Sequence, residues 1–152
     1  MLVRAVKVGV PVLLVLLMGC DPAVDAGISV APRPLLGRSA TTDSALAIAA
    51  ELAHTRGLKD FPPKYGDVPF DECFNDGQLY FCGKSVNGEA QFLFRQWRPK
   101  LSPRADSLRT ELVLRLRAAF GSETVRACTW DVVAKKPDES RCKPTPVKDS
   151  AK

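Results

Sequence analysis

The chain has 152 residues, with 22 lysines and arginines, 17 aspartates and glutamates, and a formal net charge of +5. This length is too short for two domains of ordinary size, so we expect one small domain with loose ends. His54 is the single histidine, and no two of the five cysteines have the C-x₂-C spacing of common zinc sites. Length and composition therefore argue against a multidomain protein and against a zinc site.

The first twenty residues have the pattern of an export signal. Arg4 and Lys7 precede an apolar run of eleven residues, from Val8 to Met18. At about 1.5 Å per helical residue, this run falls well short of the roughly 30 Å core of a bilayer. An A-x-A-like cleavage site is missing. The run therefore fits the apolar region of a secretory signal. The residues after it do not fit the cleavage site of an ordinary signal peptide.

The segment ends in Leu17-Met18-Gly19-Cys20, which resembles the lipobox of bacterial lipoproteins. The resemblance implies that residues 1–19 are a cleaved signal peptide, and that Cys20 receives a diacylglycerol and an N-terminal acyl chain. Such a double anchor attaches a protein stably to a membrane. We therefore expect a lipid-anchored protein that faces the periplasm. Asp21 resembles the inner-membrane retention signal of enterobacterial lipoproteins, which favours the inner membrane. Other bacteria sort their lipoproteins by different rules, so the outer membrane is the alternative location.

Without residues 1–19 the chain has 20 cations and 17 anions, a net charge of +3. This charge is too mild to indicate nucleic-acid binding, and a periplasmic location also argues against it. Besides Cys20, four cysteines remain: Cys73, Cys82, Cys128 and Cys142. An even number of cysteines in an oxidising compartment predicts two disulfides.

Sequence neighbours are the favoured partners for these disulfides. The pairs are then Cys73–Cys82 and Cys128–Cys142, each worth about 3 kcal/mol in the chain-entropy model. A tight hairpin at residues 76–77 would place a tyrosine, and not Cys82, opposite Cys73. The first pair therefore requires a wider turn, and a Cys82–Cys128 cross-link between neighbouring strands is the alternative.

Residues 20–40 contain three prolines, two glycines and no aromatic residue, so we expect a flexible tether that spans roughly 25 Å. A first helix is predicted from Ser44 to Arg56, with Thr42 or Asp43 as its N-cap. Gly57 is placed to end it in a left-handed conformation. The apolar stripe of this helix is rich in alanine, so another element should approach it closely: Ala45, Ile48, Ala49 and Leu52.

Residues 59–69 contain three prolines and are predicted to be a loop, with an edge strand beginning near Val68. Asn87-Gly88 then predicts a type I′ turn between strands at 78–86 and 89–97. In this register one face carries the expected core residues Leu79, Phe81, Phe92 and Phe94. The other face is mixed and carries Tyr80, Cys82, Leu93, Arg95 and Trp97.

A second helix is the clearest element, with Ser102 as cap, Pro103 at the first helical position and Gly121 at the end. Its apolar stripe is Ala105, Leu108, Leu112, Leu116, Ala119 and Phe120. A last strand is expected from about Thr124 to Val133, with Val125 and Ala127 on one face and Cys128, Trp130 and Val132 on the other. Residues 143–152 are predicted to be a disordered tail.

This order of elements predicts an α+β fold. The sheet would be small and antiparallel, with three or four strands, two helices on one face, and disulfides that staple the structure. The domain would span residues 41–142, between the tether and the tail.

The sequence contains no convincing catalytic constellation. His54 lies near the end of the first predicted helix, where a capping or solvent-exposed histidine is the expected role. Asp67, Asp71, Glu72 and Asp76 form an acidic cluster that lacks the spacing of a calcium loop, so a solvated loop is expected. We therefore predict a protein that is not an enzyme, with no catalytic residue, no metal and no cofactor.

Two surfaces could meet a partner. The mixed strand face with Tyr80, Arg95 and Trp97 is the best candidate binding surface, because these residue types dominate interface hot spots. Its alternative is that the tail or a disulfide loop covers it. The second helix has a basic side that could meet an acidic partner or anionic headgroups, although a solvated face is the expected role: Arg104, Arg109, Arg115 and Arg117.

These features predict a lipid-anchored, non-enzymatic domain that binds another protein of the envelope. An inhibitor or immunity protein is one concrete form, by analogy with small lipoproteins of that class. The alternative is a cell-envelope enzyme, or a binder of glycan or peptidoglycan fragments, that uses the acidic loop 67–76 and the aromatic strand face.

Overall fold

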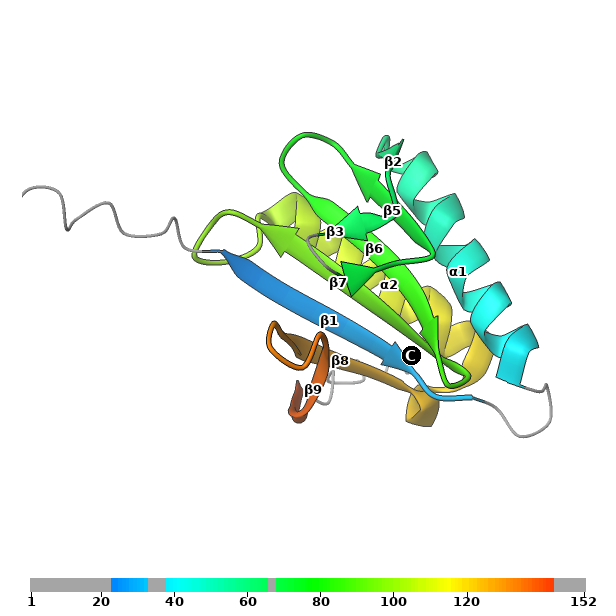
Figure 1. Cartoon of the computed structure of the whole chain (residues 1–152). Coiled ribbons are helices and arrows are strands. Elements are labelled where there is room, and N and C mark those ends of the chain that lie inside the picture. The colour runs from blue at the N-terminus through cyan, green and yellow to red at the C-terminus, as the bar shows by residue number, and fades with distance from the viewer. Residues whose placement is uncertain (1–22, 33–37, 66–67, 144–152) are drawn as a thin grey trace, which may run out of the picture.

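The computed structural model describes residues 23–32, 38–65 and 68–143. A seven-stranded antiparallel sheet has the order β2-β5-β6-β7-β1-β8-β9, and both helices pack on one of its faces (Figure 1). Strands β3 and β4 form a separate ribbon. The elements are β1 (Val24–Val30), α1 (Arg38–Thr55), β2 (Lys59–Phe61), β3 (Lys64–Tyr65), β4 (Val68–Pro69), β5 (Glu72–Asn75), β6 (Tyr80–Val86), β7 (Glu89–Gln96), α2 (Pro103–Phe120), a 3₁₀ turn (Ser122–Thr124), β8 (Val125–Asp131) and β9 (Lys136–Lys143).

The predicted sheet of three or four strands is wrong. Three of the seven strands lie in segments predicted to be tether, loop and charged tail, namely β1, β2 and β9. Strands β2 and β9 are the two edge strands of the sheet. Each pairs with a neighbouring strand on one side only, so its sequence can be largely polar. Among the described residues, no helix is long and apolar enough to cross a membrane. Cys20 and the signal segment lie outside the described residues.

Strand β1 overturns the predicted tether and moves the start of the domain ahead of residue 41. It runs through the middle of the sheet and pairs with β7 on one side and β8 on the other (Figure 1). Ala26, Ile28 and Val30 alternate along it and face the core. The proline and glycine content around this strand concealed a short period-two pattern.

Helix α1 begins earlier than predicted, at Arg38, and ends at Thr55. Gly57 has a φ of +79° and the Leu58 amide donates to the Ala53 carbonyl, so the predicted left-handed C-terminus is confirmed. The alanines of α1 allow the helix to approach the sheet closely. Gly83 on β6 shows how close this approach is, because a Cβ at that position would lie 2.8 Å from Leu46 Cδ2 of the helix.

The β6–β7 hairpin has the predicted register, with Val86 opposite Glu89 and Gly83 opposite Phe92. Helix α2 has its predicted bounds, and the Ser102 side chain accepts from the Ala105 amide. In its buried stripe Val113 replaces the predicted Ala119, which is exposed. The large core lies between the helices and the sheet and includes Leu79, Phe81, Phe92 and Phe94.

Both favoured disulfides are confirmed. Cys73 and Cys82 lie directly opposite each other on β5 and β6, because four residues and not two connect these strands. Cys128 on β8 is bonded to Cys142 on β9. The second disulfide therefore fixes a strand where a pinned tail was expected.

Candidate binding surface

The sheet face opposite the helices, here called the outer face, is only partly covered. A small cluster of Phe70, Cys73, Cys82, Leu93 and Trp130 is buried at its centre. Lys84 Nζ lies 5.2 Å from the Trp130 ring centroid and 5.8 Å from that of Phe70. It also donates to the Lys135 carbonyl at 2.7 Å. The centre of the outer face is therefore covered by Phe70, which precedes β5, and Lys84 links this centre to the segment before β9.

The predicted surface residues lie together beside this covered centre. Tyr80 and Trp97 meet edge to face with ring centroids 5.3 Å apart, and Phe61 packs on Tyr80 in the same way at 5.2 Å. The Arg95 guanidinium lies 6.0 Å from the Trp97 ring centroid. Trp97 is 49% exposed and Phe61 is 37% exposed. We call Phe61, Tyr80, Arg95 and Trp97 the aromatic–arginine surface.

Asp25 on β1 holds Arg95 in place. Both side chains are largely buried, at 8% and 17% exposure, and Arg95 Nη2 donates to Asp25 Oδ2 at 2.6 Å while Arg95 Nε donates to Oδ1. This two-point contact fixes the plane of the guanidinium beside Trp97. Sequence reasoning missed both Asp25 and Phe61, because their strands were assigned to the tether and to the proline-rich loop.

The acidic cluster does not form one site. Asp71 Oδ2 accepts from the Ser85 amide at 2.6 Å, so it continues the pairing of the sheet. Asp76 Oδ1 accepts from the Leu79 amide at 2.8 Å and shapes the turn between β5 and β6. Asp67 lies outside the described residues, and the described part of the chain holds no group of three possible metal ligands.

Glu72 has an unusual environment. It projects from β5 on the side of Phe74, toward the helices, and its Oε1 atom is buried without a hydrogen-bond partner. Burial, followed by the nearby charge of Asp71, raises the pKa of Glu72 to about 7. No signal in the sequence separates Glu72 from its acidic neighbours, because the difference comes from the helix packed above it.

His54 is an exposed histidine near the C-terminus of α1, as expected. Its Nε2 atom lies 2.8 Å from Asp60 Oδ1, and its ring meets the edge of Phe74 with centroids 5.3 Å apart. These contacts join the end of α1 to β2 and give the histidine a structural role.

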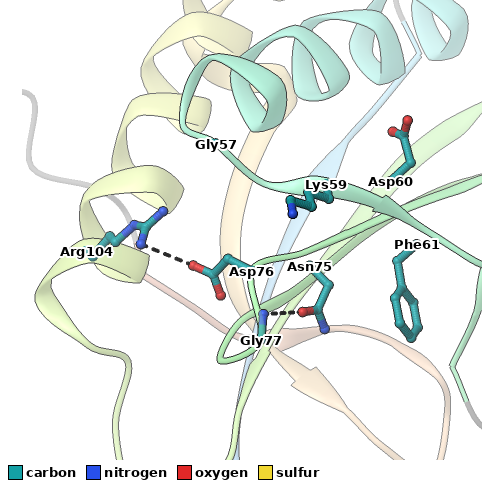
Figure 2. A pocket seen from close by; sticks show the side chains of 8 residues that line it. All are labelled: Gly57, Lys59, Asp60, Phe61, Asn75, Asp76, Gly77 and Arg104. Carbon is teal, nitrogen blue, oxygen red and sulfur yellow. Dashed lines mark hydrogen bonds and ion pairs between the residues drawn. The ribbon is translucent and has the colours of Figure 1, made fainter.

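A polar cavity of about 540 Å³ opens beside the aromatic–arginine surface, between the ends of both helices and the turn after β5 (Figure 2). Phe61 and Lys59 line one side of it. Arg104 and Asp76 meet across it, with Nη1 3.4 Å from Oδ2. The charges in this cavity therefore neutralise one another.

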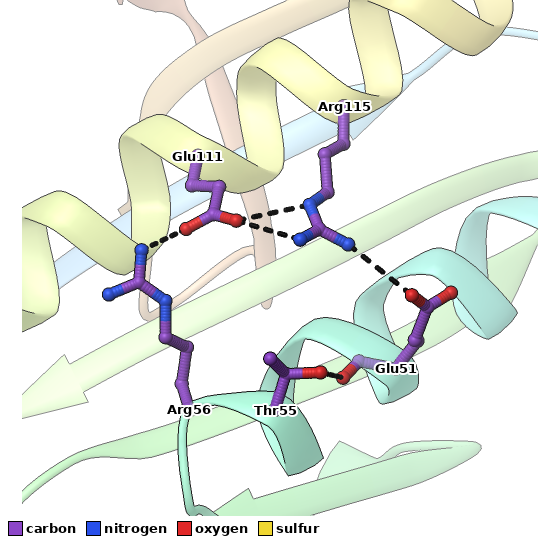
Figure 3. Close-up of polar contacts among 5 residues, drawn as sticks. All are labelled: Glu51, Thr55, Arg56, Glu111 and Arg115. Atoms are coloured by element: carbon purple, nitrogen blue, oxygen red, sulfur yellow. Dashed lines mark hydrogen bonds and ion pairs between the residues drawn. The ribbon is translucent and has the colours of Figure 1, made fainter.

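The basic side of α2 is largely used within the molecule. Arg115 contacts Glu111 one turn away at 2.8 Å and reaches Glu51 on α1 at 3.6 Å, while Arg56 also bonds Glu111 (Figure 3). These contacts clamp the two helices together. Arg117 donates to the Val125 carbonyl.

No protein-family model matches the chain, and no curated protein matches it.

Proposed function

We propose that this chain is a lipid-anchored protein of a bacterial cell envelope that binds another protein through the aromatic–arginine surface, with no catalysis of its own. An inhibitor or immunity protein held at the membrane is one concrete form of this function. The observation that carries the proposal is the mutual packing of Phe61, Tyr80, Arg95 and Trp97 at the open end of a partly covered sheet face.

Two physical properties of this surface support the proposal. Trp, Tyr and Arg are enriched among the few residues that supply most of the binding energy at protein interfaces. Rings that already pack on one another lose little conformational freedom when a partner arrives, so less of that energy is lost to ordering. The buried contact between Asp25 and Arg95 serves the same purpose for the guanidinium.

The lipid anchor is supported by the lipobox-like sequence and would place this surface close to the bilayer. Strand β1 begins at Val24, four residues after Cys20. Four extended residues span at most about 14 Å, compared with the roughly 25 Å of a free tether. A partner would therefore be engaged near the membrane surface.

Site-specific photocrosslinking in cells tests the binding surface. A photoreactive residue at position 97 should yield a discrete adduct with one protein, whereas the same residue at position 114 should not. Leu114 is a matched control because it is also exposed, at 59%, but lies on α2. Once the partner is identified, Trp97→Ala should weaken its binding at least tenfold and Leu114→Ala by less than twofold. Equal adducts or equal losses at the two positions would contradict the proposal.

Membrane fractionation tests the anchor separately. Cys20→Ala should abolish labelling by a radioactive fatty acid and release the protein from the membrane fraction. Unchanged fractionation of the variant would refute the lipid anchor.

An envelope enzyme or glycan binder is the second candidate, and the raised pKa of Glu72 is the observation that favours it. Against it, Asp71 and Asp76 are engaged by separate parts of the backbone, so the carboxylates do not converge on a substrate position. The protein-binding function therefore has the better support.

A further inference from the structure

A second cavity, of about 630 Å³, lies at the end of the sheet where β1 begins. Its floor is formed by the helix-facing side of β1 and β8, and the start of α2 and the loop before it form its walls. The lining includes the apolar side chains of Val24, Ala26, Leu101 and Ala127. This volume is within the range of small-molecule sites, and the lining is preformed because Gln96 Oε1 accepts from the Ser102 amide at 2.7 Å and so holds the loop.

Cations dominate the rim of this cavity. Lys100, Arg109 and Arg141 line it, together with the carboxylate of Asp106, and Arg141 Nε also lies 3.5 Å from Asp138 Oδ2. Asp25 also lines it, but the carboxylate of Asp25 is bonded to Arg95 on the outer face. The cavity therefore carries a net positive charge and has an apolar floor.

Arg109 is the most distinctive group in the cavity. Its side chain is only 23% exposed, and its Nε atom is buried without a hydrogen-bond partner. The nearest carboxylate, on Asp106, is 62% exposed and lies 4.0 Å away, at the outer limit of an ion pair. Burial lowers the pKa of Arg109, so the guanidinium has lost water without gaining a strong counter-ion. An anion bound at its outer nitrogens would compensate for the lost hydration.

The position of the cavity indicates where such an anion would come from. Val24 lines the cavity and lies within about 14 Å of Cys20 along the chain. A lipid on Cys20 would therefore hold the cavity at the level of the phospholipid headgroups. Basic pockets on the membrane side of a protein commonly bind anionic headgroups.

We infer that this cavity binds the headgroup of an anionic phospholipid, with the phosphate at Arg109 and Lys100 and the adjoining apolar part against Val24, Ala26 and Leu101. Anion binding in this cavity is inferred from its geometry and charge alone. The choice of a lipid, as opposed to free phosphate, rests on the proposed lipid anchor. The aromatic–arginine surface is not part of this cavity, because it lies on the opposite face of the sheet.

The test uses the full lipoprotein, purified from membranes and reconstituted into nanodiscs of phosphatidylcholine with 0 or 30% phosphatidylglycerol. Phosphatidylglycerol should raise the Tm by roughly 5 °C, as expected for a tenfold excess of ligand over its Kd in a domain of this size. Arg109→Gln should abolish the rise. Lys100→Gln, at an exposed position that should not disturb folding, should at least halve it. The matched control Arg126→Gln removes the same charge near the opposite end of β8 and should keep the full rise.

The possible outcomes separate the explanations. An equal loss in Arg126→Gln would reduce the effect to general attraction by the charged surface and overturn the inference. An equal rise with 10 mM inorganic phosphate on pure phosphatidylcholine discs would replace the lipid by free phosphate. A protein that does not enter the discs contradicts the lipid anchor, whereas one that enters and shows no response to phosphatidylglycerol contradicts the cavity.

Discussion

Replacing Glu72 by glutamine should stabilise the protein at neutral pH, because the folded state holds this carboxyl where its charge is unfavourable. The ordinary pKa of 4.5 applies to the unfolded chain, and the folded pKa is about 7. The folded state therefore binds the proton more tightly, so stability is complete below pH 4.5, falls as the pH rises to about 7, and stays lower above it.

The structure sets the size of this effect. The difference between 4.5 and about 7 corresponds to roughly 3 kcal/mol for a fully buried group. Glu72 retains contact with water, which reduces the expected effect to about 1–2 kcal/mol. Glu72→Gln should therefore match the original protein near pH 4 and exceed its free energy of unfolding by about 1–2 kcal/mol at pH 8.

Urea unfolding from pH 4 to pH 8, with both disulfides intact and followed by tryptophan fluorescence, measures this difference. Glu139→Gln is the matched control, because it removes an exposed carboxylate on β9 and should show no comparable gain. A Glu72→Gln advantage that stays constant over this pH range would refute the reasoning, since a neutral side chain would then stabilise for reasons unrelated to the charge.

Three further predictions concern stability, each measured as the free energy of unfolding in urea. Gly83→Ala should cost about 1–2 kcal/mol, because the new Cβ would lie 2.8 Å from Leu46 Cδ2. The cost should be smaller in a Leu46→Ala background, and an equal cost in both backgrounds would exclude that contact as the cause. Asp25→Asn should cost about 3 kcal/mol, since it leaves the largely buried Arg95 without its carboxylate, and a loss below about 0.5 kcal/mol would mean that the pair is not structural. Replacing both cysteines of the second disulfide by serine should cost about 3 kcal/mol, as expected for a sequence separation of 14, and no loss would show that β9 holds without it.

The elements that could be predicted from the sequence are those with a local physical cause. Asn87-Gly88 forces a two-residue turn and thereby the whole register of β6 and β7. Ser102 and Gly121 define both ends of α2 through backbone bonding within one turn. The disulfide pairing also followed from proximity along the chain, and the need for a wider turn before Cys82 was visible in the spacing.

The candidate surface was predicted only in part. Tyr80, Arg95 and Trp97 share a face because strands alternate, which is a local rule. Phe61 and Asp25 join them through strands whose partners lie far away in the sequence, so no local pattern could indicate their presence. Which part of that face is covered also depends on distant segments, since Phe70 packs on its centre and Lys84 bonds the Lys135 carbonyl.

The sequence by itself determined the hairpin, the second helix and the cysteine pairs, because each is encoded by neighbours in the chain. Only the tertiary structure decided that residues 24–30 form an interior strand of the sheet, that Asp25 holds Arg95, and that Glu72 and Arg109 are poorly solvated. The physical reason is that strand pairing and the loss of solvent depend on what folds over a residue, and those partners are distant in the sequence.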